Sequence, residues 1–141
     1  MYIQYHTKHK IKMKLRTLIN SKTALELLLK GSLPISIAWD LKKFVKVVNP
    51  EFTSYAEIRE QKIIEMGEKK KNDKGKEEYK VKEKNMPAFL KLMNELLDKD
   101  IDIIIPQINI KDLMEYKDVN GKGIDMTTGD LMLLEWLIVE E

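Results

Sequence analysis

Apolar and basic residues alternate near the start of the chain. Ile11, Met13 and Leu15 are separated by single basic residues. A period of two is typical of a strand with one buried face and one face in solvent. The residues before Ile11 show no comparable pattern. We therefore expect a basic N-terminal tail over residues 1–12 and a single globular domain over residues 13–141.

Four later segments have apolar residues every three or four positions, as amphipathic helices do. They cover 21–30, 32–49, 50–66 and 85–97. Ser21, Ser32 and Asn85 stand where N-caps are expected, because their side chains can accept a hydrogen bond from a free helical N–H. The pattern leaves open whether the second and third segments form one long helix that is kinked at Pro50.

Turn-forming and β-branched residues predict the strands. The hydrophilic stretch 67–78 contains Asn72-Asp73-Lys74-Gly75, which favours an exposed loop or hairpin, with a strand following at Tyr79–Lys82. Ile101–Ile105 is a second β-branched run, and Pro106 either ends that strand or makes it an edge strand.

Every residue from Leu131 to Val139 except Glu135 is apolar, and this stretch predicts a final helix from about Gly129 to Val139. Thr127 and Asp130 resemble a capping box at its start, with Asp in place of the usual Glu. Together the segments predict an α+β fold of about five helices packed with a small antiparallel sheet of two or three strands.

This final helix is the main candidate for partner binding. A surface helix of a lone domain should carry a polar face, whereas this one is apolar on nearly every side. Either it lies centrally in the core, or part of it meets another protein. In the second case Met132, Leu133 and Trp136 are the candidate contacts, because Trp is enriched at interface hot spots. Trp39 lies off the apolar stripe of its own helix and is a further candidate.

Charge is unevenly distributed along the chain. Residues 1–22 hold six Lys or Arg and no Asp or Glu, whereas residues 86–141 hold five Lys and twelve acidic residues. Basic residues near the N-terminus could contact nucleic-acid phosphates. They are Lys8, Lys10, Lys12, Lys14 and Arg16. The acidic half of the chain would repel nucleic acid, so we favour lysines that protect a strand edge from unwanted pairing, with nucleic-acid binding as the alternative.

Candidate catalytic and metal-binding groups are few. The chain has no Cys, which excludes thiol catalysis and cysteine-ligated zinc. Its two histidines, His6 and His9, both lie near the N-terminus. The acidic run at residues 98–102 lacks the Gly and Glu of a calcium loop, and the glycines at 121 and 123 lack phosphate-loop spacing. We therefore expect no cofactor, no metal and no enzymatic activity, and no apolar run is long enough to cross a membrane.

The order of features resembles a known group of proteins. The likeness begins with MKLRTLINSKTALELLLKGSLPISIAWDLKK from residue 13 and the Tyr55-to-Arg59 segment. It continues through a charged turn, the join YKVKEKNMPAFLKLMNELLD, an isoleucine strand and the closing GDLMLLEWLIVEE. They are similar to small uncharacterised proteins encoded by phages and prophages of Gram-positive bacteria, over roughly residues 13–141. The resemblance implies an accessory protein that acts in the bacterial cytoplasm or in the virion.

These observations lead to one expected function and two alternatives. We expect a non-enzymatic factor that binds a host or phage protein and could inhibit a host defence protein. The first alternative is a virion or tail-assembly component that self-associates into a homo-oligomer. The second is a nucleic-acid-binding protein that uses the basic N-terminal segment.

Overall fold

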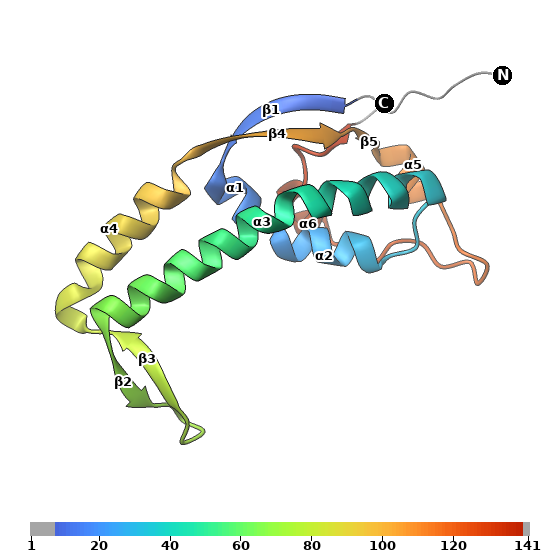
Figure 1. Cartoon of the computed structure of the whole chain (residues 1–141). Coiled ribbons are helices and arrows are strands. Elements are labelled where there is room, and N and C mark those ends of the chain that lie inside the picture. The colour runs from blue at the N-terminus through green and yellow to red at the C-terminus, as the bar shows by residue number, and fades with distance from the viewer. Residues whose placement is uncertain (1–7, 140–141) are drawn as a thin grey trace. The chain divides into compact units, whose positions relative to one another are not determined.

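The computed structural model describes residues 8–139 and has an α+β fold (Figure 1). Within that range there are six α-helices, a short 3-10 helix and three pairs of strands, where the sequence predicts about five helices and one small sheet. The elements in chain order are β1 (Lys8–Lys14), α1 (Leu15–Asn20), α2 (Lys22–Lys30), α3 (Ile35–Met66), β2 (Gly67–Lys71), β3 (Glu77–Val81), η1 (Glu83–Asn85), α4 (Met86–Leu97), β4 (Asp100–Pro106), β5 (Ile108–Asn109), α5 (Ile110–Glu115), α6 (Thr128–Leu133) and β6 (Ile138–Val139).

The chain forms two compact units. We call residues 49–99 the central unit, and residues 1–48 together with 100–141 the terminal unit. The sequence predicts one domain over residues 13–141 and does not indicate this division. Residues 8–12, which the sequence assigns to a tail, belong to strand β1, and residues 1–7 lie outside the described range.

Strands β1 and β4 form the antiparallel pair of the terminal unit. On one face Ile11 lies opposite Ile103 and Met13 lies opposite Ile101, and Met13 and Ile103 are buried. On the other face Lys12 lies opposite Asp102 and Lys14 lies opposite Asp100. The alternation read from the sequence is therefore confirmed, since apolar and charged residues occupy opposite faces. Leu15 already belongs to α1.

Helix α3 joins the second and third predicted helices into one element of 32 residues with Pro50 inside it. The boundary between the two units falls beside this proline, at Asn49. Pro50 has no N–H to donate within the helix, so the helical hydrogen bonding is weaker at this position than elsewhere.

The predicted final helix is too long. Helix α6 ends at Leu133, residues 134–137 form turns, and β6 pairs in parallel with β5. Leu134 and Leu137 are buried in the core, while the N–H of Ile108 donates to the carbonyl of Leu137 at 3.2 Å. Apolar residues line nearly every side of a helical projection because the second half of the run is not helical.

Three predicted capping side chains bond elsewhere. The hydroxyl of Ser21 donates to the carbonyl of Leu18 at 2.8 Å, and that of Ser32 donates to Asp118. The side-chain amide of Asn85 donates to the carbonyl of Met66 at 2.8 Å, which satisfies the C-terminal end of α3 rather than the start of α4. Only the capping box of Thr127 and Asp130 is confirmed among these side-chain predictions.

Candidate functional site

The first half of α3 has two unlike faces within the terminal unit. Leu41, Phe44 and Val48 form the buried face and are at most 4% exposed. At 100° per residue, Trp39 lies almost directly opposite these three side chains, so it faces solvent. An apolar residue in this position has no role in the core of the described structure.

Four residues at strict i, i+4 spacing define this outer face, which we call the Trp39 stripe: Ile35, Trp39, Lys43 and Val47. Ile35 is 88% exposed, Trp39 63% and Val47 65%. The Lys43 ammonium lies 4.8 Å from the centre of the Trp39 ring, within range of a cation–π contact. Of these four residues, the sequence predicts only Trp39 as a contact. Ile35 lies four residues before it and Val47 eight residues after it, so the sequence also contains the signal for the whole stripe.

The surroundings of the Trp39 stripe are basic. Lys42 and Lys46 lie on the same outward half of the helix as Lys43. Asp40 is the one acidic residue between Ile35 and Val48, so this stretch carries a net positive charge. An apolar stripe with a cationic margin complements an apolar surface with an acidic margin.

The other predicted contact residues do not share one helix face with each other. Met132 and Leu133 are exposed on α6, at 66% and 44%. Trp136 follows α6 in a turn and is half-buried. Its ring centre lies 5.8 Å from that of Phe44, and its indole N–H donates to the carbonyl of Leu133 at 3.0 Å. Trp136 therefore packs against the inner face of α3, whereas Trp39 stands on the outer face.

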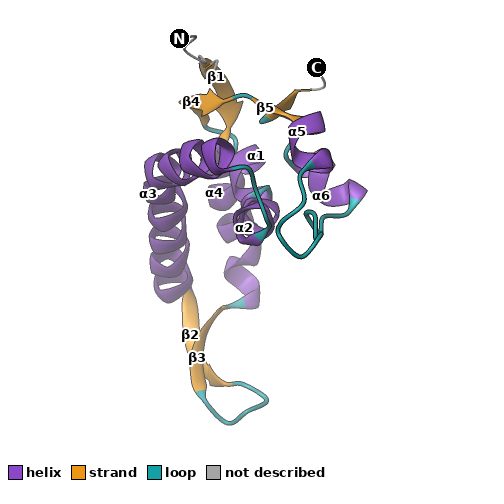
Figure 2. Ribbon diagram, turned by 90° about the vertical axis from the view of Figure 1, so that its right-hand side faces the viewer, coloured by secondary structure: helices purple, strands orange, loops and turns teal. Residues whose placement is uncertain are grey.

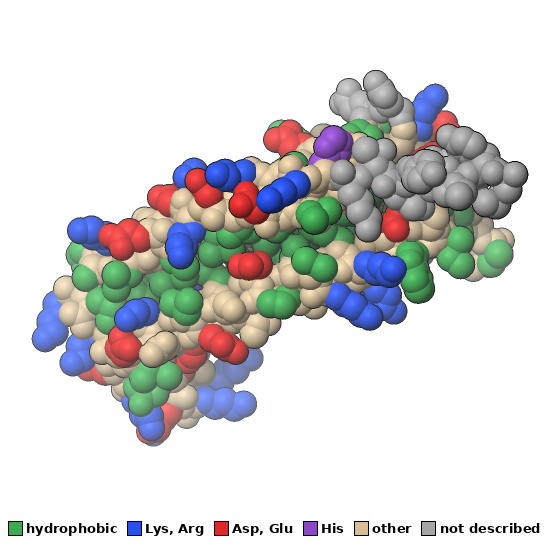
Figure 3. Space-filling view, turned by 45° about the horizontal axis from the view of Figure 1, so that its top comes forward, with side chains coloured by type: hydrophobic (Ala, Val, Ile, Leu, Met, Phe, Trp, Pro, Cys, Tyr) green, Lys and Arg blue, Asp and Glu red, His purple; other side chains and the backbone are tan. Residues whose placement is uncertain are grey.

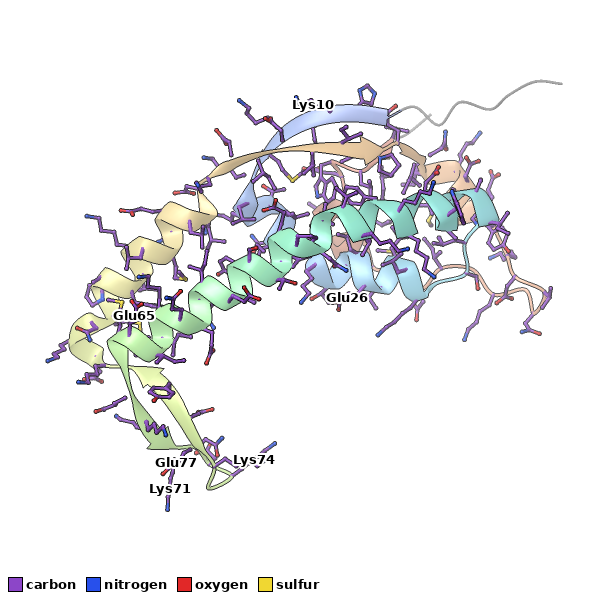
Figure 4. The ribbon with its side chains drawn as sticks, viewed as in Figure 1. Lys10, Glu26, Glu65, Lys71, Lys74 and Glu77 are labelled. Atoms are coloured by element: carbon purple, nitrogen blue, oxygen red, sulfur yellow. The ribbon has the colours of Figure 1, made fainter. Side chains whose placement is uncertain are left out.

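The basic residues near the N-terminus lie along β1. Lys10, Lys12 and Lys14 share its exposed face, on which Figure 4 labels Lys10. Asp102 and Asp100 stand directly across from Lys12 and Lys14, so part of this positive charge is balanced within the strand pair. Lys8 begins the strand, and Arg16 is half-buried in α1.

A carboxylate in the loop after α5 holds the segment that leads into α3. Asp118 Oδ2 accepts from Ser32 Oγ at 3.0 Å, and its Oδ1 accepts from the backbone N–H groups of Asn120 and Lys122. The hydrogen bond from the Lys122 N–H, followed by that from Ser32, lowers the pKa of Asp118 below its ordinary value of 3.8. The start of the helix that carries the Trp39 stripe is thus tied to a distant loop.

In the described part of the chain, side chains that could hold a metal ion do not cluster. Between residues 8 and 139, no three His, Asp or Glu side chains gather closely enough to hold a metal ion. His9 is exposed on β1, and His6 lies outside the described residues. None of the helices described here is both long enough and apolar enough to cross a membrane.

Comparison with known proteins identifies no similar family, protein or structure. No protein-family model matches the chain, and neither a curated protein nor a solved structure matches it.

Proposed function

We propose that this chain is a non-enzymatic protein-binding factor whose Trp39 stripe docks into an apolar groove with an acidic rim on another protein. The observation that carries the proposal is Trp39, which is 63% exposed on the side of α3 that faces away from the core. Trp is enriched among the few residues that supply most of the affinity at protein interfaces. Helix faces with anchors one turn apart commonly bind in such grooves.

The resemblance to phage and prophage proteins supports the choice of partner. It favours a host or phage protein, met in the bacterial cytoplasm or in the virion, and inhibition of a host defence protein is one such role. The positive charge of Lys42, Lys43 and Lys46 supports an acidic rim on that partner. Charge of this kind mainly speeds association and selects among partners.

The test begins with affinity capture from a Gram-positive host lysate, followed by measurement of the dissociation constant for the captured protein. Trp39→Ser should weaken binding by about 30-fold, the equivalent of about 2 kcal/mol for a hot-spot residue. Ile104→Ser is the matched control, since Ile104 is also an exposed apolar residue of the terminal unit, at 58%. It should leave the dissociation constant unchanged.

Fluorescence provides a second measurement, because the chain has only two Trp. In Trp136→Phe the remaining Trp39 should be quenched readily by acrylamide in the free chain and protected in the complex. The proposal is wrong if no specific partner is captured, if the partner binds Trp39→Ser as tightly as the original chain, or if Ile104→Ser is equally impaired.

The same variants separate this proposal from self-association. A chain that sediments as a symmetric oligomer and becomes a monomer on Trp39→Ser would assign the Trp39 stripe to a second copy, as a virion or assembly component requires. A monomer in both cases leaves the stripe available for a different protein.

A further inference from the structure

The two faces of the β2–β3 hairpin, in the central unit, carry different arrangements of charged side chains. Residues 67–82 include seven lysines against four acidic residues. Figure 2 shows the hairpin between the end of α3 and the start of α4, and in Figure 3 basic and acidic side chains are mixed at this end of the molecule. Every residue from Lys69 to Lys80 except Asn72 is exposed, so both faces are open to a ligand.

On one face of the hairpin, positive and negative side chains are equal in number and form ion pairs. Because residues directly opposite in an antiparallel pair share a face, Glu68 and Lys80 lie together with Lys70 and Glu78. The ammonium of Lys70 lies 3.3 Å from a Glu68 oxygen, and that of Lys80 lies 3.7 Å from a Glu78 oxygen. Two lysines and two glutamates thus neutralise one another on this side.

The opposite face, which we call the Tyr79 face, is cationic and aromatic. Lys69 lies opposite Tyr79, and Lys71 lies opposite Glu77. The Lys69 ammonium lies 5.7 Å from the centre of the Tyr79 ring, and Tyr79 as a residue is 38% exposed. Among the described residues, neither Lys69 nor Lys71 has an acidic side chain at ion-pair distance.

The tip of the hairpin adds two more lysines on a well-ordered turn. Asn72 Oδ1 accepts from the N–H groups of Lys74 and Lys76 at 2.9 and 3.0 Å, and Gly75 takes a positive φ of 76°. Lys71, Lys74 and Glu77 lie together at this end of the ribbon (Figure 4). The lysines are therefore presented from a defined backbone rather than from a loose loop.

The base of the hairpin is held just as firmly. The carbonyl of Met66 accepts from the N–H of Lys82 at 3.1 Å and from the side chain of Asn85. A Cβ on Gly67 would lie only 2.4 Å from the carbonyl oxygens of Ile63 and Lys80, so the backbones approach closely there. The base of the hairpin thus packs closely against the last turn of α3.

We propose that the Tyr79 face binds single-stranded nucleic acid, with a base stacked on Tyr79 and the adjoining phosphates contacted by Lys69 and Lys71. An exposed aromatic ring beside unpaired cations is the combination that single-strand-binding surfaces use. A base in a duplex is already stacked and cannot reach the ring, which favours a single strand. Both this face and the basic N-terminal strand have acids across from lysines, Glu77 opposite Lys71 here and two aspartates opposite Lys12 and Lys14 there. What sets the Tyr79 face apart among the described residues is the exposed tyrosine beside Lys69.

The experiment measures binding of the full chain to a fluorescent dT20 oligonucleotide by anisotropy over a range of salt concentrations. The double variant Lys69→Gln/Lys71→Gln should weaken binding about tenfold or more. It should also reduce the slope of log K against log salt by about 1.4, since each phosphate contact on a single strand contributes about 0.7. The matched control is Lys70→Gln/Lys80→Gln, which removes the same charge from the neutral face and should change the affinity by less than about twofold.

Stacking is tested separately from charge. Tyr79→Leu should weaken binding about tenfold, within the range for one stacked base, whereas Tyr79→Phe should retain the affinity. Circular dichroism of each variant checks that the fold is kept. The proposal is overturned if the original chain does not bind dT20, or if the two double variants lose affinity equally. Binding of a 20-base-pair duplex or of anionic vesicles with no dependence on Tyr79 would overturn it as well.

Discussion

The two compact units bury very different amounts of apolar side chain. Among the described residues, fifteen buried apolar residues belong to the terminal unit and three to the central unit: Phe52, Phe89 and Met93. The central unit nevertheless has regular helices and a well-formed hairpin. The comparison indicates that the hydrophobic effect contributes most in the terminal unit, whereas close backbone contacts such as that at Gly67 contribute more in the central unit.

The largest expected effect comes from the terminal core. Leu28 is fully buried on α2, so Leu28→Ala should lower the free energy of unfolding by about 2–5 kcal/mol. Leu90→Ala is the exposed comparison on α4 of the central unit, where the side chain is 52% exposed, and it should cost no more than about 0.5 kcal/mol. Urea unfolding measures both, and equal costs would contradict the burial of Leu28 in the terminal core.

The next effect tests whether backbone packing holds the hairpin. Gly67→Ala forces two carbonyl groups apart and should cost about 1–3 kcal/mol. Hydrogen exchange should accelerate at β2 and β3 and stay unchanged at β4. Gly129→Ala is the control, because its Cβ would lie at an ordinary distance of 3.6 Å from the Thr127 hydroxyl. Unaltered exchange in the hairpin of Gly67→Ala would show that the close approach is unimportant.

A smaller effect is expected at a turn that occurs once in each unit. Asn72 and Asp118 each accept, through Oδ1, from the N–H groups two and four residues later. The third residue after each is a glycine with positive φ, at 76° for Gly75 and 78° for Gly121. Since a Cβ at either glycine meets nothing within 4 Å, Gly75→Ala and Gly121→Ala should each cost about 1 kcal/mol from backbone strain alone. Thermal unfolding that shows stabilisation by either change would contradict this.

The smallest effect concerns acid stability of the terminal unit. The pKa of Asp118 is lowered in the folded chain, so its ionised form stabilises the fold above the ordinary value of 3.8. This stabilisation is lost as the pH falls through the lower folded pKa. Asp118→Asn should therefore flatten part of the decline in melting temperature between about pH 5 and pH 2, and Ser32→Ala should do so to a lesser degree. If the melting temperature of Asp118→Asn falls with pH as steeply as that of the original chain, ionised Asp118 does not stabilise the fold.

Local chemistry determined much of the fold. The alternation in β1, the turn at Asn72–Gly75 and the capping box of Thr127 are all legible in the sequence, because each depends on neighbours within a few residues. The α+β class follows from the same local patterns. Trp39 could also be recognised as an outlier from the helical period of its segment.

Tertiary structure decided the rest. Helix α6 stops at Leu133 because Leu134 and Leu137 are buried and Ile138 pairs with Ile108, which lies 30 residues earlier. The hydroxyl of Ser32 and the amide of Asn85 bond to groups that come near only after folding. The two faces of the hairpin likewise depend on strand register, which composition alone does not set.

The candidate sites divide in the same way. The sequence by itself determined that Trp39 and Trp136 are unusual, since Trp is rare and each departs from a simple amphipathic pattern. Only the tertiary structure decided that Trp136 packs on Phe44 while Trp39 faces solvent. The physical reason is that burial depends on contacts between distant segments, whereas sequence patterns report mainly on the residues of a single element.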